Sequence, residues 1–288
     1  MATIDLRPLS LGEILDRTFS LYRNNFLLFI GITAIPQLLI LAVHLAQLLL
    51  PGYVGTVRVG PAQSALSGGM AAFALIGGLL GLIVYLAAYL FAQGGTVYAV
   101  SELYLGRTTT IADSLRRMRG QAMNLFGVTL LNGLAIFVGF IFLIIPGIWL
   151  ACRLMTCVPA ALLEDLGARD SLERSYRLTE GSAGRAFVIY LLYFVMAIIA
   201  ASLFTYPFDV MMALSLRTHP DSVRMWLALA QVGNTIGETL ITPILLIATA
   251  VFYYDLRVRK EAFDLQLMMN PGGSARAPGS GTLPSMLS

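Results

Sequence analysis

The chain has 288 residues, of which 57% are hydrophobic and 12% charged, and its formal net charge is +3. Soluble domains of ordinary composition carry about 25% charged residues, so this composition excludes a soluble globular protein and indicates one that crosses a membrane several times. The small net charge gives no reason to expect a nucleic-acid partner.

The first predicted element is an amphipathic helix from Ser10 to Asn25. Ser10 and Glu13 have the spacing of a capping box, in which each side chain bonds the other residue's backbone N–H. The apolar residues recur at helical spacing on one side, at Leu11, Ile14, Leu15, Phe19 and Tyr22. This face packs either against acyl chains or against the rest of the protein, and the sequence leaves both open.

A similar pattern occurs three times, at residues 11–17, 111–117 and 168–174. Each copy places an acid four residues before an arginine, in the pairs Glu13–Arg17, Asp113–Arg117 and Asp170–Arg174. This order favours an ion pair on an exposed helix face. We interpret the chain as three repeat units, at about residues 10–104, 110–163 and 167–255; chance recurrence in a chain rich in Leu and Arg is the alternative.

Six apolar segments approach the roughly 20 residues that a helix needs to cross a bilayer. They are Phe26–Leu50, Met70–Val100, Met123–Ile145, Ile148–Leu163, Ala186–Leu216 and Met225–Tyr254. For the fourth, a stretch from Ile145 to Pro159 that dips into the membrane without crossing is the alternative. The expected fold class is an all-α polytopic membrane bundle, with six transmembrane helices as three hairpins, each preceded by a cytoplasmic amphipathic interfacial helix. Residues 270–288 are rich in Gly, Pro and Ser, and we expect a disordered cytoplasmic tail.

The basic residues predict the orientation. Fifteen of the nineteen Arg and Lys residues fall near the two termini or in the segments that hold the repeated helices. By the positive-inside rule, both termini then lie in the cytoplasm, and the protein is expected in a bacterial cytoplasmic membrane. Trp149 and Trp226 are expected at the outer ends of spans four and six, in an aromatic belt.

Four segments carry a family resemblance: Leu6–Phe26, Ile145–Arg153, Glu164 with the following Ser171–Ser175, and Phe252–Gln266. Together they resemble the membrane domain of the bacterial glycerophosphoryl diester phosphodiesterase family. The resemblance implies a helical integral-membrane domain that occurs alone or fused to a phosphodiesterase barrel. A barrel of that kind needs about 250 further residues, which this chain lacks. Its two histidines, His44 and His219, lie in a span and in an outer loop, so no phosphodiesterase activity is expected.

Glu238 is the most distinctive polar residue, because it lies near the middle of span six, where a charge costs several kcal/mol. Gln231 and Asn234 share its face of the helix, and Gly233 and Gly237 allow a close helix neighbour. Arg153 in span four is the predicted partner of Glu238, directly or through water. The candidate interior polar cluster is therefore Arg153, Glu238, Asn234 and Gln231.

Several roles for this cluster stay open. The pair can lock two hairpins together, or line a polar cavity for a headgroup, an ion or a proton. Glu238 can also be protonated, or Arg153 can extend to an interface. Four further arginines are candidate contacts for anionic headgroups, at about 1 kcal/mol each, with ordinary positive-inside anchoring as the alternative: Arg107, Arg116, Arg117 and Arg119.

The sequence contains no catalytic motif, and we expect no enzyme activity, no cofactor and no metal site. The leading hypothesis is a non-enzymatic membrane protein that acts in envelope or lipid homeostasis or as a membrane scaffold. The alternative is a transporter or channel for a small or lipid-like solute, through a polar interior around Arg153 and Glu238. Expected partners are membrane lipids, and the further candidates are protein partners or a second copy of the chain.

Overall fold

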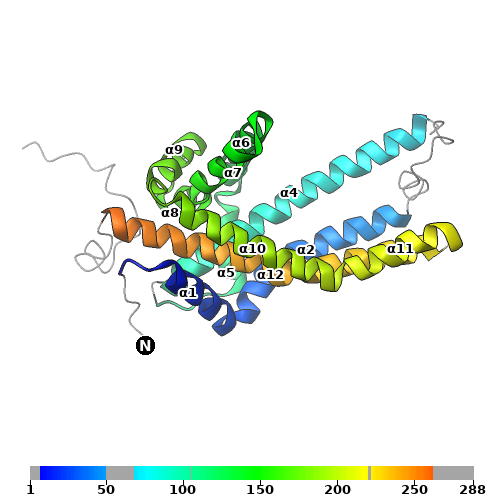
Figure 1. Cartoon of the computed structure of the whole chain (residues 1–288), viewed down its shortest axis with the longest axis horizontal. Helices are drawn as coiled ribbons and strands as arrows, with labels where there is room; N and C mark the ends of the chain where they lie inside the picture. The colour runs from blue at the N-terminus through cyan, green and yellow to red at the C-terminus, as the bar shows by residue number, and fades with distance from the viewer. Residues whose placement is uncertain (1–6, 50–67, 105, 220–221, 262–288) are drawn as a thin grey trace, which may run out of the picture.

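The computed structural model describes residues 7–49, 68–104, 106–219 and 222–261, which are helical and contain no strand. The expected tail at 270–288 lies outside the described residues. The helices, drawn in Figure 1, are α1 (Leu11–Asn24), α2 (Phe26–Leu49), α4 (Gly68–Tyr104), α5 (Ile111–Arg119), α6 (Ala122–Phe142), α7 (Ile144–Arg153), α8 (Cys157–Glu164), α9 (Ala168–Leu178), α10 (Ala183–Phe204), α11 (Tyr206–Thr218) and α12 (Val223–Glu261).

Six of the described helical stretches are long and apolar enough to cross a membrane. They are α2, α4, α6, α7 together with α8, α10, and α12. The protein is therefore an all-α, multi-pass membrane helical bundle, and the predicted fold class of an all-α polytopic bundle with six spans is confirmed.

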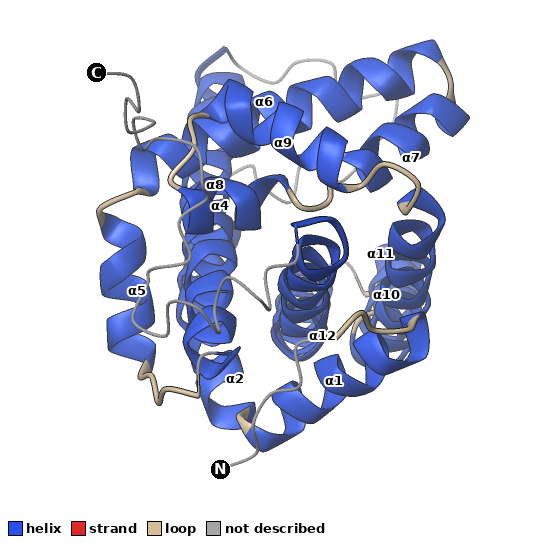
Figure 2. Ribbon diagram, turned by 90° about the vertical axis from the view of Figure 1, so that its left-hand side faces the viewer, coloured by secondary structure: helices blue, strands red, loops and turns tan. Residues whose placement is uncertain are grey.

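Helix α12 is the central element of the bundle. It packs against α1, α2, α4, α10 and α11, and in Figure 2 it is seen end-on with other helices around it. Every residue from Ala250 to Val258 is buried. The apolar residues of this part are covered by neighbouring helices, and the acidic residues near the end of α12 reach arginines of α9 and α10.

Helix α1 forms as predicted and packs on the bundle. Ser10 Oγ accepts from the Glu13 backbone N–H at 3.3 Å, while Glu13 Oε2 accepts from the Ser10 N–H at 2.7 Å, which completes the capping box. Ile14 and Thr18 are fully buried, whereas Phe19 is 39% exposed. The apolar face is thus directed mainly toward α12, with Phe19 at its edge.

In two of the three repeated helices the arginine pairs with an acid outside its own helix and not with the acid four residues before it. Arg117 instead binds Glu102 at the end of α4, and Arg174 binds Glu164 at the end of α8. A pair on an exposed helix face contributes only about 0.5 kcal/mol, whereas the Glu102 and Glu164 side chains are 12% and 1% exposed. The arginines therefore reach the more buried acids.

Two predicted spans are interrupted. The fourth consists of α7 and α8 with a break at 154–156, and the fifth consists of α10 and α11 with a break at Thr205. Pro159 and Pro207 lie in the first turns of α8 and α11, where proline is tolerated. Continuing either helix backwards would set the proline ring against the carbonyl four residues earlier, so the chain breaks there.

The short helices gather at one end of the bundle. We use the term short-helix end for α1, α5, α8, α9 and the last turns of α12, which lie at the same end of the bundle in Figure 1. In Figure 2, α6 and α9 run across the view while α12 is seen end-on. The α6–α7 hairpin is therefore inclined to the central helix.

Candidate functional site

Arg153 is the last residue of α7 and is only 6% exposed. Its guanidinium carbon lies 3.8 Å from the centroid of the Tyr176 ring and 5.6 Å from that of Trp149. Its Nε is buried and has no hydrogen-bond partner in the described part of the chain. No ion pair joins this guanidinium to any acid in the described ranges, so the two aromatic rings are its main neighbours.

The break after Arg153 is held by helix α9. The Arg153 carbonyl accepts hydrogen bonds from Thr179 Oγ1 at 2.7 Å and from Ser175 Oγ at 3.1 Å. These bonds satisfy a carbonyl that the interrupted helix leaves open. They also fix Arg153 beside the turn between α9 and α10.

The surroundings of Arg153 do not balance its charge. Burying an ion without a counter-charge costs several kcal/mol. A desolvated cation–π contact contributes about 2 kcal/mol, and the Trp149 and Tyr176 side chains supply no negative charge. The site is thus chemically suited to an anion.

Glu238 lies elsewhere and has different partners. Its Oε2 accepts from Gln37 Nε2 at 2.9 Å, and its Oε1 accepts from Asn234 Nδ2 at 3.1 Å. Of the predicted cluster, Asn234 is therefore placed correctly. Gln231 contributes its backbone carbonyl to Thr235 Oγ1 at 2.9 Å. Gln37 was not in the predicted cluster, although its position in span one could have suggested it.

The predicted direct pair between Arg153 and Glu238 is wrong. Along α10, Arg185 meets Asp255 of α12, whereas Ala200 lies against Gly237. Glu238 therefore lies about 25 Å along α12 from Asp255 at the short-helix end. Arg153 lies nearer that end, because Ser175 and Thr179 at the end of α9 bind its backbone carbonyl.

The predicted headgroup arginines are partly engaged with protein. Arg107 and Arg117 both approach Glu102, and each side chain is 56% exposed. Arg116 is exposed on α5. Arg119 is the last residue of α5, and its side chain lies outside the described part of the structure. The partial exposure leaves the headgroup hypothesis open.

The sequence did not reveal an ionic network at the short-helix end. Glu164 accepts from Arg174 Nε at 2.8 Å, from Arg174 Nη2 at 2.9 Å and from the Tyr253 hydroxyl at 2.7 Å. Arg174 also binds Glu261. Although burial opposes it, the hydrogen bonds with Glu261 and Glu164 raise the pKa of Arg174 above its ordinary value. The guanidinium therefore stays charged.

A second part of this network ties the N-terminal segment to α12. Asp255 accepts from the Leu9 backbone N–H at 2.7 Å and pairs with Arg185 at 2.8 Å and Arg259 at 3.0 Å. Arg185 also donates to the Leu9 carbonyl at 2.8 Å. The available sequence signal was the charged run that follows an apolar helix from Asp255 onward. These contacts hold α1, α10 and α12 together.

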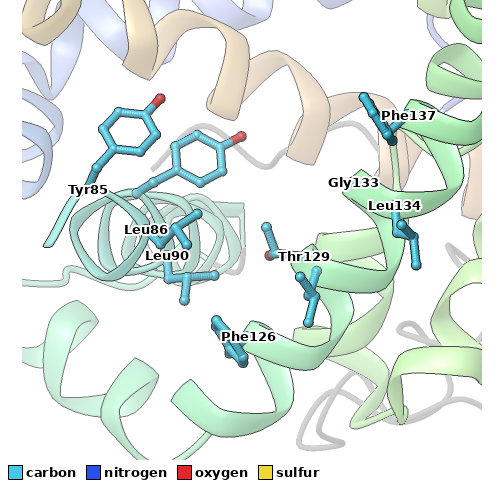
Figure 3. Close-up of a pocket in the computed structure, with 10 residues that line it drawn as sticks. Tyr85, Leu86, Leu90, Phe126, Thr129, Gly133, Leu134 and Phe137 are labelled. Atoms are coloured by element: carbon cyan, nitrogen blue, oxygen red, sulfur yellow. The ribbon is translucent and has the colours of Figure 1, made fainter. Parts of the chain in front are cut away.

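A cavity of about 420 Å³ lies between α4 and α6. Figure 3 shows α4 on one side and α6 on the other. Most of the lining is apolar and consists of Leu86, Leu90, Phe126, Leu130, Leu134 and Phe137. The other lining residues are Tyr85, Tyr89, Thr129 and Gly133. Thr129 Oγ1 is buried and has no hydrogen bond within the described residues.

No protein-family model, curated protein or solved structure matches the chain. The family resemblance therefore stays an expectation, and a functional hypothesis has to rest on the geometry of the bundle.

Proposed function

We propose that this protein is a non-enzymatic membrane protein that binds membrane lipid, with an acyl chain held in the cavity between α4 and α6. The single observation that supports this proposal is the cavity itself. Its volume of about 420 Å³ lies within the range of ligand sites in proteins, roughly 300 to 1,000 Å³. Both walls belong to helices that are long and apolar enough to cross a membrane, so acyl chains are the surrounding solvent.

The polar atoms of the cavity suit a lipid better than a hydrocarbon. Tyr89 receives a hydrogen bond from Gln93 Nε2 at 3.4 Å, and the Thr129 hydroxyl has no hydrogen-bond partner among the residues that the structure describes. A hydroxyl donor in an apolar wall can bind the ester carbonyl of a glycerolipid. Binding there would satisfy a polar group whose burial otherwise costs free energy.

A transporter that uses one polar interior around Arg153 and Glu238 needs the two residues close together. Glu238 instead accepts hydrogen bonds from Gln37 and Asn234, and no ion pair joins it to Arg153 in the described part of the chain, which favours the lipid-binding role. We further propose that the protein resides in a bacterial cytoplasmic membrane, with both termini and the short-helix end in the cytoplasm. The distribution of Arg and Lys along the chain supports this orientation.

The cavity offers a sharp test at Gly133. A Cβ added there meets nothing within 4 Å, so Gly133→Phe places a ring toward the cavity without a backbone clash. Gly78→Phe is the matched control, because its Cβ also meets nothing within 4 Å and Gly78 is outside the cavity lining. Both changes replace a helical glycine, so their effect on helix propensity is similar.

The measurement is photo-crosslinking in nanodiscs with a phospholipid that carries a diazirine on its acyl chain, followed by peptide mapping. We expect labelled peptides that contain Phe126 or Leu134, strong reduction of that labelling in Gly133→Phe, and normal labelling in Gly78→Phe. Equal labelling of both variants would contradict the proposed site.

A further inference from the structure

We propose that Arg153 binds the phosphate group of a membrane phospholipid at the short-helix end, between Trp149 and Tyr176. The site belongs to α7 and α9 and shares no residue with the α4/α6 cavity. It therefore does not rest on the proposed function, and either proposal can fail while the other stands.

The first step is the contrast between Arg153 and its neighbouring arginines. Arg174 binds Glu164 and Glu261, and Arg185 binds Asp255. Their side chains are 18% and 22% exposed. Arg153 is more deeply buried, at 6% exposure, and forms no ion pair with an acidic side chain in the described ranges. A guanidinium in such surroundings is stabilised by an anion from outside the chain.

The second step is the direction of its hydrogen-bond donors. The Tyr176 ring centroid lies 3.8 Å from the guanidinium carbon, so the ring covers a face of the guanidinium. The N–H groups lie in the guanidinium plane and point past the ring. Arginine presents these donors as a planar fork that matches two oxygens of a phosphate. Stacking and phosphate binding are therefore compatible at one side chain.

The third step identifies the source of the phosphate. Helix α7 begins with Ile144 and Ile145, which are 67% and 80% exposed, so this part of α7 faces acyl chains. Arg153, at the other end of the helix, is bonded to Thr179 beside the α9–α10 turn. Arg153 thus lies where the apolar surface of α7 meets α9, the helix that carries Arg174 of the ionic network.

The exposed aromatic residues indicate the same depth. Trp149 is 48% and Tyr176 41% exposed, and their rings meet edge to face at 5.9 Å. Trp and Tyr are enriched at the headgroup level of membranes. A phosphate joined to acyl chains fits this position better than a phosphate free in water.

Trp149 provides a direct probe of the site. The chain has two tryptophans, so Trp226→Phe leaves Trp149 as the single fluorophore. The full chain in dodecyl maltoside is titrated with short-chain phosphatidylglycerol, with diacylglycerol of the same chains, and with inorganic phosphate. We expect a saturable change in Trp149 emission with phosphatidylglycerol, a weaker change with phosphate, and none with diacylglycerol.

Each of the other outcomes decides against the proposal. An equal response to diacylglycerol shows that acyl chains alone are bound. Tighter binding of inorganic phosphate than of phosphatidylglycerol assigns the site to soluble phosphate and overturns the lipid source. No response to either phosphate compound overturns the site itself.

Variants in the same background test the role of the guanidinium. Arg153→Gln should weaken phosphatidylglycerol binding by about tenfold or more, as expected for the loss of charge-assisted hydrogen bonds. Arg177→Gln is the matched control, because Arg177 is an exposed α9 residue whose side chain is 68% accessible, and binding should be unchanged.

Arg153→Lys keeps the charge without the planar fork and should weaken binding severalfold. If Arg153→Gln does not fold, this variant decides the question. Affinity equal to the parent protein in Arg153→Lys, or in a folded Arg153→Gln, would overturn the proposal.

Discussion

The contact between α10 and α12 at Gly233 allows a quantitative prediction. A Cβ added at Gly233 would lie 1.7 Å from the Phe204 carbonyl oxygen, whereas one at Gly237 would lie 3.6 Å from Ala200 Cβ. The predicted close approach at this pair of glycines is thus confirmed. Gly233→Ala must move α12 from the end of α10 by more than about 1 Å to restore normal contact distances.

Overpacking of this kind costs about 3 kcal/mol when the neighbour is backbone, which cannot rotate away. Alanine is favoured over glycine in a helix by about 1 kcal/mol, so Gly233→Ala should lose about 2 kcal/mol net. Gly237→Ala has the same propensity gain without the clash. The two variants should therefore differ by about 3 kcal/mol, or roughly 6 to 12 °C in melting temperature.

The assay is the fraction of monodisperse protein that remains after heating in detergent, measured by size-exclusion chromatography. Gly237→Ala is the matched control, one helical turn from Gly233 on the same helix. If the two variants melted within about 1 °C of each other, the backbone contact at Phe204 would be refuted.

Three further predictions concern the carboxylates. Glu164→Gln should lower the free energy of unfolding by about 3 kcal/mol, measured by denaturation in mixed micelles. Asp165→Asn is the control, because Asp165 is the next residue and is exposed, and it should have little effect. Equal losses in the two variants would contradict a network centred on Glu164. Hydrogen bonds from Ser10 and from Arg7 hold the pKa of Glu13 at about 2, below the ordinary 4.5. The stabilising contribution of Glu13 is therefore complete above about pH 4.5 and is lost as the pH falls through about 2. In thermal melts between pH 2 and 6, this loss of melting temperature at low pH should disappear in Glu13→Gln and remain in Asp16→Asn. Glu238→Leu leaves the amide donors of Gln37 and Asn234 unpaired and should be about 2 kcal/mol less stable than Glu238→Gln. Equal unfolding midpoints of the two variants in the same denaturation assay would refute this prediction.

The features that could be predicted from the sequence depend on short stretches of chain. The capping box of Ser10 and Glu13 placed the start of α1 within one residue of its observed start at Leu11. Apolar length alone identified the spans, because crossing a bilayer sets a minimum helix length. Both signals can be detected without knowledge of which helices are neighbours.

The fourth span shows why proline alone was insufficient. Pro36 and Pro243 lie inside continuous helices, whereas Pro159 follows a break. The break is stabilised by Ser175 and Thr179, whose hydroxyls bind the Arg153 carbonyl. The outcome depends on whether another helix supplies donors, and spacing along the chain does not contain that information. Trp149 was expected at the outer end of span four, but its ring packs against Tyr176 of α9. This contact likewise depends on a neighbouring helix that the spacing along the chain does not reveal.

The buried ionic contacts could not be predicted, because their partners are distant in sequence. Asp255 and Leu9 are 246 residues apart, and Tyr253 and Glu164 are 89 apart. A spacing argument on one helix cannot rank such partners. It also led to the wrong partners for Arg117 and Arg174, since the acid on the same helix was the only candidate visible locally.

The bond between Leu9 and Asp255 has a consequence for biosynthesis. At about 5 to 20 residues per second, synthesis of the intervening chain takes about 10 to 50 s. During this interval the N-terminal segment has no partner on α12, so α1 reaches its final packing only after the last span has entered the membrane. A nascent chain that stops before Asp255 would leave this segment accessible to proteases. The docked N-terminus thus marks a polypeptide whose membrane insertion is complete.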